Sequence, residues 1–449
     1  MQAVDTIAAL STPPGRGGVA VIRVSGPRVP EIAVALLGTL PAPRQARLCV
    51  FRDADGTAMD HGLALYFEAP ASFTGEHVLE LQGHGSPMLN DLLLARLLAL
   101  GARLARPGEF SQRAFINDRL GLAEAEAIAD AIDAGSHAAA RAAVRSLQGV
   151  FADQVRALAA AIVELRVYTE AAIDFPDEEV DFLAEGEVQT RLQALRDRLY
   201  TLQAGASRGA RLREGMTVVI AGAPNVGKSS LLNRLAARDS AIVTPIAGTT
   251  RDVLRENIDL DGLPLHVVDT AGLRETDDPV EAEGVRRARA QVDQADRILL
   301  VVDDGQGLQP EDLALLAQYG DRLPVTLVAN KIDLSGAHAG LDQHAGHDLV
   351  RLSAATADGI DVLVAHLRQA AGLADAQEAD FIARRRHLDA LARAATALEQ
   401  GHHRLVDDQA GELLAEELRL AHAALGEITG EFTSEDLLGA IFSSFCIGK

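Results

Sequence analysis

The 449-residue chain contains no tryptophan, and aromatic residues make up only 4% of it. Its core must therefore consist mainly of aliphatic side chains, and the many stretches rich in alanine and leucine favour helices. No apolar run reaches the ~18–20 residues that a helix needs to cross a bilayer. The N-terminus lacks a basic segment followed by an apolar one, so we expect no signal peptide and a cytoplasmic protein without membrane contact.

Cysteine is equally scarce. Cys49 and Cys446 are the only two in the sequence, and they lie far apart. This usage argues against a disulfide framework and against a zinc site, because both depend on several suitably spaced cysteines. It fits a protein that works in a reducing compartment.

Lysine is rare in a way that points to function. Only three of the 42 Lys and Arg residues are lysines, namely Lys228, Lys331 and Lys449. An ammonium is a compact point charge on a flexible stem, whereas a guanidinium is a wide planar fork. The three lysines therefore mark positions where arginine would not serve. Lys228 and Lys331 both lie in motifs typical of nucleotide-binding proteins.

The formal net charge of −22 repels polyanions such as RNA. An RNA-binding function would therefore require local basic patches or a basic partner protein. Three arginine clusters are candidates for such patches, although each could equally be a solvated helix face. The clusters are Arg208, Arg211 and Arg213; Arg286, Arg287 and Arg289; and Arg384, Arg385 and Arg386.

The composition divides the chain into four segments. Residues 1–118 are typical of mixed α/β structure, with strand-like runs around a Gly/Pro-rich loop at Thr12–Gly18. Residues 119–212 and 375–449 are helical, whereas residues 213–374 alternate short apolar runs with helical segments, as in a buried parallel sheet. We expect an α/β and α protein: a mixed α/β N-terminal domain, a discontinuous helical domain and an inserted α/β domain.

The inserted segment contains a phosphate-binding motif. Residues Gly222–Ser229 match G-x-x-x-x-G-K-[ST], follow the strand-like run Thr217–Ala221 and precede a helical run, which is the context that the motif needs. The backbone N–H groups of such a loop and the helix dipole converge on phosphate oxygens. We expect Lys228 to reach the β- and γ-phosphates and the Ser229 hydroxyl to bind Mg²⁺.

Further nucleotide motifs follow in order. A threonine in Gly248–Asp252 can reach Mg²⁺ and sense the γ-phosphate, while Asp269 can hold the metal through water. The N–H of Gly272 can bond the γ-phosphate. Asp333 can accept hydrogen bonds from guanine N1–H and N2–H, a donor pair that adenine lacks, so the chain should select GTP over ATP. Backbone contacts from Ser353-Ala354 could reach guanine O6.

The residues leave the route of hydrolysis open. Leu273 occupies the position where many small GTPases have a glutamine that orients water. A nearby carboxylate could orient or deprotonate the water instead. The charge on the breaking bond could be neutralised by Arg251, by Arg274, or by a monovalent cation bound to the Asn225 carbonyl oxygen. The candidate carboxylates are Glu275, Asp277, Asp278, Glu281 and Glu283.

Several motifs outside the nucleotide set are more specific. They are Asp5-Thr6-Ile7, Thr12–Gly18, Phe73-Thr74-Gly75-Glu76, Leu81-Gln82-Gly83-His84-Gly85 and the terminal Phe445-Cys446-Ile447-Gly448-Lys449. With the nucleotide motifs, they make the whole chain resemble the MnmE (TrmE) family of tRNA-modification GTPases. Ser86 departs from the family pattern, which has glycine there.

The resemblance implies three parts: an N-terminal folate-binding and dimerisation domain, a discontinuous helical domain and an inserted P-loop (Ras-like) G domain. It also implies GTP hydrolysis activated by K⁺. At the positions that match the family's motifs, the resemblance implies that Ser229 and Thr250 hold Mg²⁺ and that Glu281 is the catalytic carboxylate. The implied K⁺ ligands are Asn225, Thr244, Ile246 and Thr249. The implied site for 5-formyl- or 5,10-methylene-tetrahydrofolate comprises Arg23, Glu80, Arg119 and Lys449, with Cys446 nearby as a possible reactive group.

The same resemblance extends the GTP-contacting set. It comprises Asn225, Val226, Gly227, Lys228, Ser229, Ser230, Thr244, Pro245, Ile246, Ala247, Gly248, Thr249, Thr250, Asp269, Thr270, Ala271, Gly272, Asn330, Lys331, Asp333, Ser353 and Ala354. The implied partner of the homodimer is MnmG, an FAD-dependent protein with which it forms a heterotetramer. Together they would modify C5 of the wobble uridine of certain tRNAs. The alternatives are a ribosome-assembly switch that binds rRNA without modifying it and, less well supported, a G domain serving membrane transport.

Overall fold

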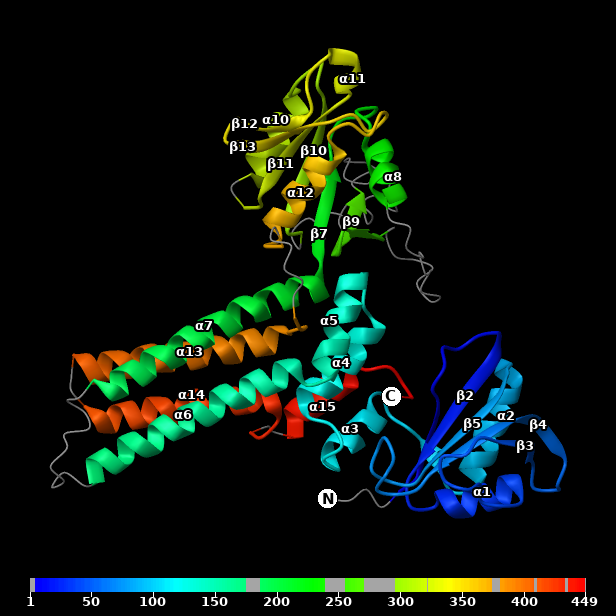
Figure 1. Cartoon of the computed structure of the whole chain (residues 1–449). Helices are drawn as coiled ribbons and strands as arrows, with labels where there is room; N and C mark the ends of the chain where they lie inside the picture. The colour runs from blue at the N-terminus through cyan, green and yellow to red at the C-terminus, as the bar shows by residue number, and fades with distance from the viewer. Residues whose placement is uncertain are drawn as a thin grey trace. The chain divides into compact units, whose positions relative to one another are not determined.

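The structure is a computed structural model that describes residues 5–174, 186–238, 255–269, 295–320, 322–373, 380–407, 410–432 and 435–448. The chain divides into two compact units. One comprises Met1–Ala129, Ser146–Arg198 and Ala390–Lys449, and the other comprises Asp130–Arg145 and Leu199–Asp389. Each unit is therefore assembled from segments that are distant in the sequence (Figure 1).

The N-terminal part of the first unit is a six-stranded sheet with the order β3-β4-β5-β2-β1-β6. Its central strands β2 and β5 are antiparallel, and their register pairs Arg23 with Glu80. Ile22 and Val24 of β2 are buried beneath helices α1 and α2, as expected for a strand with one face on the core. The elements are β1 (Ile7–Leu10), β2 (Gly17–Ser25), α1 (Val29–Leu37), β3 (Arg47–Arg52), β4 (Ala58–Phe67), β5 (Val78–Gly85), α2 (Pro87–Ala99) and β6 (Arg103–Leu104).

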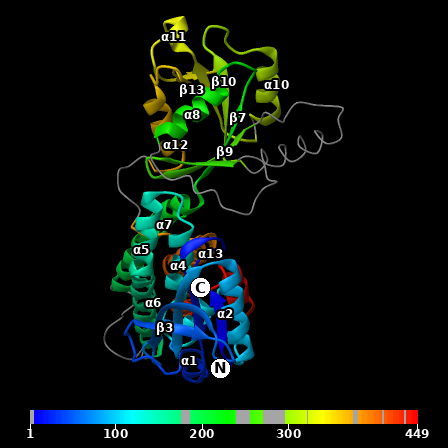
Figure 2. The ribbon, with the colours of Figure 1, turned by 90° about the vertical axis from the view of Figure 1, so that its right-hand side faces the viewer.

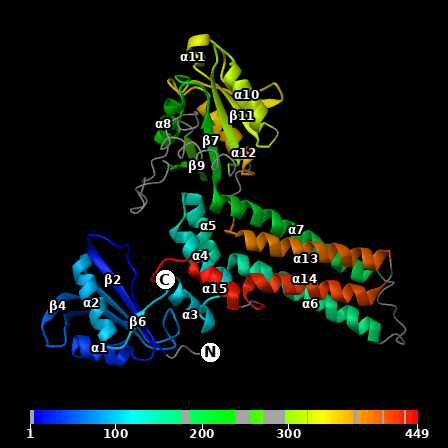
Figure 3. The same cartoon turned by 180° about the vertical axis from the view of Figure 1, so that it is seen from behind.

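The rest of the first unit is helical. The long helices α6 (Val150–Asp174) and α14 (Gly411–Thr429) pack along each other, and the ion pair Arg196–Glu399 joins α7 to α13. Figures 1 and 3 show these four helices side by side. The other helices that contribute to this unit are α3 (Glu109–Ile116), α4 (Leu122–Ile132), α7 (Glu187–Glu214), α13 (Arg385–Val406) and α15 (Glu435–Ser443).

The second unit is built on a seven-stranded sheet with the order β12-β13-β11-β10-β7-β9-β8. The five inner strands are parallel, and the two edge strands β8 and β12 are antiparallel to their neighbours. The strands are β7 (Met216–Ala221), β8 (Arg255–Leu260), β9 (Leu263–Asp269), β10 (Arg297–Asp303), β11 (Val325–Asn330), β12 (Gly340–His344) and β13 (His347–Arg351).

Helices cover both faces of this sheet, which explains why its central strands β7, β10 and β11 are buried along most of their length. Helices α8 (Lys228–Arg238) and α12 (Ile360–Ala370) pack on one face, and α10 (Pro310–Tyr319) packs on the other (Figure 2). Helix α5 (His137–Leu147) contributes Ala142 and Ala143 to the first of these cores. The short helix α11 (Ile332–Ser335) follows β11.

The expected fold class is confirmed, with an α/β domain inserted between helical segments. The residue boundaries 119, 213 and 375 remain predictions. None of the helices in the described part of the chain combines the length and apolar character that crossing a bilayer requires.

Candidate functional site

The phosphate loop lies between β7 and α8, at the carboxyl end of a buried strand. Gly222 has a φ of +136° and Gly227 a φ of +100°, a region that side chains strongly disfavour. A Cβ on Gly222 would collide with the carbonyl oxygen of Val301, and one on Gly227 with the amide nitrogen of Asn330. Close approach of neighbouring chain segments therefore requires both glycines of the motif.

Lys228 is the first residue of α8 and lies over this loop. Its Nζ donates hydrogen bonds to the carbonyl oxygens of Gly222 (2.7 Å) and Ala223 (2.8 Å). Ser229 is next to it in the first turn of the helix, where the helix dipole favours anions. Asn225 has the left-handed φ of +62°. The loop thus presents an ammonium and a helix N-terminus, as a polyphosphate site requires.

The base end of the site is tied to the phosphate end by Asn330, the last residue of β11. Its Nδ2 donates to the carbonyl oxygen of Val226 (2.8 Å), and its Oδ1 accepts from the backbone N–H of Ala354 (2.9 Å). The Asn330 side chain is buried, so both bonds are shielded from water. Three loops far apart in sequence therefore meet at one amide.

The neighbouring motif residues are also fixed. Ser353 Oγ donates to Asp333 Oδ1 (2.6 Å), which orients the carboxylate expected to accept from guanine. Lys331 has a left-handed φ of +70°, and its Nζ lies 2.9 Å from Oδ2 of Asp303 at the end of β10. The hydrogen bond from Lys331 holds the pKa of Asp303 below its usual value.

Two contributors to this site were missing from the sequence prediction. One is Asp303, which the apolar run ending in Val302-Asp303 could have indicated, because polar residues at the carboxyl ends of parallel strands gather at one edge. The other is Arg234 of α8, which donates to the carbonyl oxygens of Ala354 (3.0 Å) and Ala355 (2.7 Å). No sequence motif marked Arg234, since its partners lie 120 or more residues away.

Many of the residues predicted for the nucleotide and folate sites lie outside the part of the chain that the structure describes. The residues whose position is not described are Thr244, Pro245, Ile246, Ala247, Gly248, Thr249, Thr250, Thr270, Ala271, Gly272, Glu281 and Lys449, together with the alternatives Arg251, Arg274, Glu275, Asp277, Asp278 and Glu283. Asp269 is described only as the last backbone position of β9. The K⁺ ligand set, the second Mg²⁺ ligand and the catalytic carboxylate therefore remain predictions.

The predicted folate residues Arg23 and Glu80 meet at the centre of the N-terminal sheet. Arg23 donates from Nε (3.0 Å) and Nη2 (2.8 Å) to Glu80 Oε1. Its guanidinium also lies 5.3 Å from the ring centroid of Phe73 and 5.7 Å from that of Phe110. Because the ion pair and two aromatic faces act on one guanidinium, its orientation is fixed. Arg119, the third residue of the set, is exposed and lies beside Gly75.

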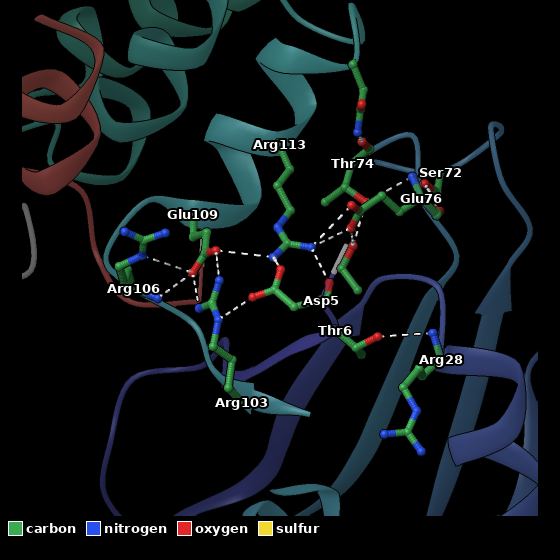
Figure 4. A network of polar contacts seen from close by, with 12 residues as sticks. Asp5, Thr6, Arg28, Ser72, Thr74, Glu76, Arg103, Arg106, Glu109 and Arg113 are labelled. Atoms are coloured by element: carbon green, nitrogen blue, oxygen red, sulfur yellow. Dashed lines mark hydrogen bonds and ion pairs between the residues drawn. The ribbon is translucent and has the colours of Figure 1, made fainter. Parts of the chain in front are cut away.

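A network of charged residues supports this region (Figure 4). Arg113 is buried and donates to Asp5 Oδ1 (2.8 Å), Glu76 Oε2 (3.0 Å) and Glu109 Oε1 (3.2 Å). Arg103 donates two further hydrogen bonds to Glu109, from Nη1 to Oε2 and from Nη2 to Oε1. Burial alone would raise the pKa of Glu109, but the hydrogen bonds from Arg103, from a backbone N–H and from Arg113 lower it to about 2.

The C-terminal motif packs against the same domain. The Cys446 carbonyl oxygen accepts from the Gly108 N–H (3.3 Å), and the Gly448 carbonyl oxygen accepts from Ser11 Oγ (3.1 Å). Gly448 has a φ of +94°, and a Cβ there would collide with the Leu10 carbonyl oxygen. The chain immediately before Lys449 is therefore held against Leu10 and Ser11, at the end of β1. Cys446 itself is exposed.

A strand, glycine-rich loop and helix beside an Asn-Lys-Ile-Asp element define a P-loop protein that binds guanine nucleotides. Residues 6–119 match the family described as GTP-binding protein TrmE N-terminus, and residues 122–446 match the MnmE helical domain. The chain belongs to the MnmE family of tRNA modification GTPases, which are GTP hydrolases.

Full-length relatives lead to the same family. The tRNA modification GTPase MnmE of Yersinia pseudotuberculosis serotype IB (strain PB1/+) is 58% identical over 454 residues, covering 100% of both chains. The protein of the same name from Pectobacterium carotovorum subsp. carotovorum (strain PC1) is also 58% identical over 454 residues, with the same coverage.

Two solved structures are similar to part of the chain. An Era variant from Aquifex aeolicus, bound to GDP and AlF4⁻, is 28% identical and covers 40% of this chain and 66% of its own, with a TM-score of 0.28. The G domain of the T. maritima FeoB iron transporter is 26% identical and covers 35% of this chain and 98% of its own, with a TM-score of 0.26.

The charge network generates a stability prediction. Truncating Arg113 to alanine leaves Asp5, Glu76 and Glu109 without their shared cation, and loss of one partner from a buried ion pair costs about 3–5 kcal/mol. We expect Arg113→Ala to lower the free energy of unfolding by that amount in urea titrations. The control is Arg106→Ala, whose largely exposed guanidinium lies 3.8 Å from Glu109 and should contribute less than about 1 kcal/mol.

The pKa of Glu109 adds a pH dependence to this prediction. Because its folded-state pKa is lowered from 4.5 to about 2, its stabilising contribution is present at neutral pH. That contribution is lost as the pH falls from about 4.5 towards about 2. Equal unfolding free energies for the two arginine variants at neutral pH would contradict the assignment.

Proposed function

We propose that this chain hydrolyses GTP to GDP in a K⁺-activated reaction. With the flavin-dependent partner MnmG, it would add a carboxymethylaminomethyl group at C5 of the wobble uridine (position 34) of certain tRNAs. One observation carries the nucleotide part of the proposal: Asn330 joins the phosphate loop at Val226 to the base-reading segment at Ala354. Membership of the MnmE family over the full length supports the tRNA part and favours it over an rRNA-binding switch.

Each part of the nucleotide would meet a group of matching chemistry. Lys228 and the N-terminus of α8 would hold the phosphates, and Asp333 would accept from the guanine N1–H and N2–H. Ser229 and Thr250 would hold Mg²⁺, which when bound neutralises charge on the phosphate oxygens. Glu281 would orient the attacking water.

The cation set follows the family pattern. Asn225, Thr244, Ile246 and Thr249 would hold K⁺ beside the phosphates, where a fixed positive charge stabilises the charge that develops in the transition state. This assignment is compatible with the loop, because Asn225 lies between β7 and α8, within the segment that would surround the phosphates, in a left-handed conformation that Asn adopts more readily than most residues.

The N-terminal domain would hold the one-carbon donor. Arg23 and Glu80 would bind the pterin or glutamate groups of a 5-formyl- or 5,10-methylene-tetrahydrofolate, together with Arg119 and Lys449. The docking of Gly448 against Leu10 and Ser11 supports this, because it brings the chain terminus to the same domain as the Arg23–Glu80 pair. We further propose a cytoplasmic homodimer that forms a heterotetramer with MnmG.

A partner protein would also overcome the electrostatic barrier to tRNA. A chain with a net charge of −22 repels a polyanion at long range. In the described residues, Arg213 and Arg384 of the candidate basic clusters bind Asp130 of the same chain. Their charges are therefore partly neutralised within the protein, which favours a route in which the partner supplies basic surface.

The modification is tested by mass analysis of wobble uridines in tRNA from cells that lack this chain. We expect the C5 carboxymethylaminomethyl group to be absent and to return when the gene is restored. A gene encoding Lys228→Ala should fail to restore it, whereas Arg106→Ala, a change far from the nucleotide motifs in sequence, should restore it fully. Unchanged uridine masses in the deletion strain would refute the tRNA function.

Base recognition is tested by Asp333→Asn. Replacing the carboxylate loses charge-assisted hydrogen bonds worth about 1.5–3 kcal/mol each, so GTP affinity should fall more than tenfold. Xanthosine triphosphate should then bind better than GTP, because the xanthine C2 carbonyl can accept from the new amide. Calorimetry on Ser353→Ala provides the control, since that variant keeps the carboxylate and loses its 2.6 Å orienting bond together with the bond from the Thr356 N–H (3.2 Å). Retained preference for GTP over xanthosine triphosphate would contradict the assignment.

The cation is tested by comparing GTP turnover in K⁺ and Na⁺. We expect turnover in K⁺ to exceed that in Na⁺ by at least tenfold, because only a fitting cation stabilises the developing charge. Asn225→Gly tolerates the φ of +62° but removes the carbonyl oxygen, so it should abolish the preference while GTP still binds. Asn225→Asp retains an oxygen and should keep it. Equal rates in both salts would exclude this role.

A further inference from the structure

One buried carboxylate joins the two places where the chain enters and leaves the α/β domain. Asp130 of α4 is almost fully buried and accepts from Arg213 Nε (2.7 Å) through Oδ1. Arg384 donates to the same side chain from Nη2 (2.8 Å) and Nε (3.2 Å). Arg213 lies in the last turn of α7, just before β7, and Arg384 directly precedes α13.

The segment that begins with Asp130 is also hydrogen-bonded to the β8–β9 hairpin. Ser136 Oγ donates to the Gly262 carbonyl oxygen (3.0 Å), and the N–H of His137 donates to Asp259 Oδ2 (3.3 Å). The Asp259 carboxylate is thus placed at the N-terminus of α5, where the helix dipole favours it. Ala142 and Ala143 continue the contact in the core that contains Ile258, Leu260, Leu263 and Leu265.

This hairpin is the only link in the chain between two of the predicted nucleotide-sensing motifs. Gly248–Asp252 precedes β8, and β9 ends at Asp269. Residues 255–260 of β8 pair without interruption with 263–268 of β9. We therefore expect the two strands of the hairpin to move together. Strand β9 also pairs with β7, which leads into the phosphate loop. A displacement of either motif would therefore shift the turn between β8 and β9, where Gly262 is hydrogen-bonded to Ser136.

We propose that residues 130–145 form a coupling segment between the nucleotide site and the helices on either side of the α/β domain. Asp130 is then a positioning residue for tRNA modification rather than for GTP hydrolysis. The proposal rests on the proposed function and deepens it. Its physical basis is that a buried carboxylate bonded to two guanidiniums constrains both, so α7 and the start of α13 must follow the hairpin together. Arg145 adds a further hydrogen bond within this part of the chain, from its Nε to the Asp380 carbonyl oxygen (2.9 Å).

The test uses the full chain with its flavin-dependent partner and compares Asp130→Asn with Asp133→Asn. Asp133 is exposed, lies in the same segment and loses the same charge, so it is the matched control. For Asp130→Asn we expect GTP turnover within twofold of the unaltered protein and tRNA modification slowed at least tenfold. Hydrogen exchange at residues 130–145, which should differ between GDP and a GTP analogue in the unaltered protein, should become independent of nucleotide. Asp133→Asn should behave as the unaltered protein does.

Ser136→Ala gives an independent test at the other end of the segment. It removes the bond to Gly262 and the bond that Ser136 Oγ accepts from the Ala139 N–H, while leaving the Asp130 pairs intact, and it should cause the same loss of modification with retained GTP turnover. Arg384→Lys, which keeps the charge but loses the planar fork, should cause a smaller loss. These variants keep the proposal testable where Asp130→Asn reduces the yield of folded protein.

Two results would overturn the coupling role. One is a parallel loss of GTP turnover and modification in Asp130→Asn and Ser136→Ala, which would indicate structural damage alone. The other is an unchanged nucleotide dependence of hydrogen exchange in both variants. If the unaltered protein failed to modify tRNA, the proposed function would fail, and the exchange measurements with nucleotide alone would still decide whether the segment senses the bound nucleotide.

Discussion

A single buried amide, that of Asn330, connects the parts of the nucleotide site. One end of it bonds the phosphate loop at Val226, and the other bonds the loop at Ala354. Gly227 must lack a side chain because this amide occupies the space above it. The spacing between the phosphate and base ends of the site is thus fixed by hydrogen bonds in a shielded environment, where they are stronger than at the surface. Lys331 and Asp333 then take their positions on the same short turn.

The inserted arrangement explains how the arginines of this chain are used. Lysine is retained at three motif positions, while arginines form the planar, bidentate contacts on which the architecture depends. Arg384 forks onto Asp130, Arg103 forks onto Glu109, and Arg23 lies between an acid and two aromatic rings. Arg384, together with Arg213, belongs to the clusters that the sequence suggests as a surface for RNA, yet both arginines stabilise contacts between distant segments of the protein.

The N-terminal domain is completed by the other end of the chain. Phe442 and Phe445 pack with Leu122 and Ala125, and Gly448 lies against Leu10 and Ser11. The terminal motif is therefore a structural part of this domain as well as a candidate ligand-binding element. The acid–arginine network around Arg113 lies on the same domain and fixes the segment Thr74–Glu76 relative to α3.

From its local patterns alone, the sequence predicted the phosphate loop, the order of the guanine motifs and the apolar inner strands β7, β9, β10 and β11, because each depends on residues close together in the chain. It did not indicate the edge strands β3, β6, β8 and β12. An edge strand has one neighbour and mixes polar with apolar residues, so it lacks a continuous apolar run. The contacts of Asn330, Arg234 and Asp130 become apparent only in the folded chain. Their partners are up to 254 residues away, and a contact over that separation is fixed by the packing of whole elements rather than by any local pattern.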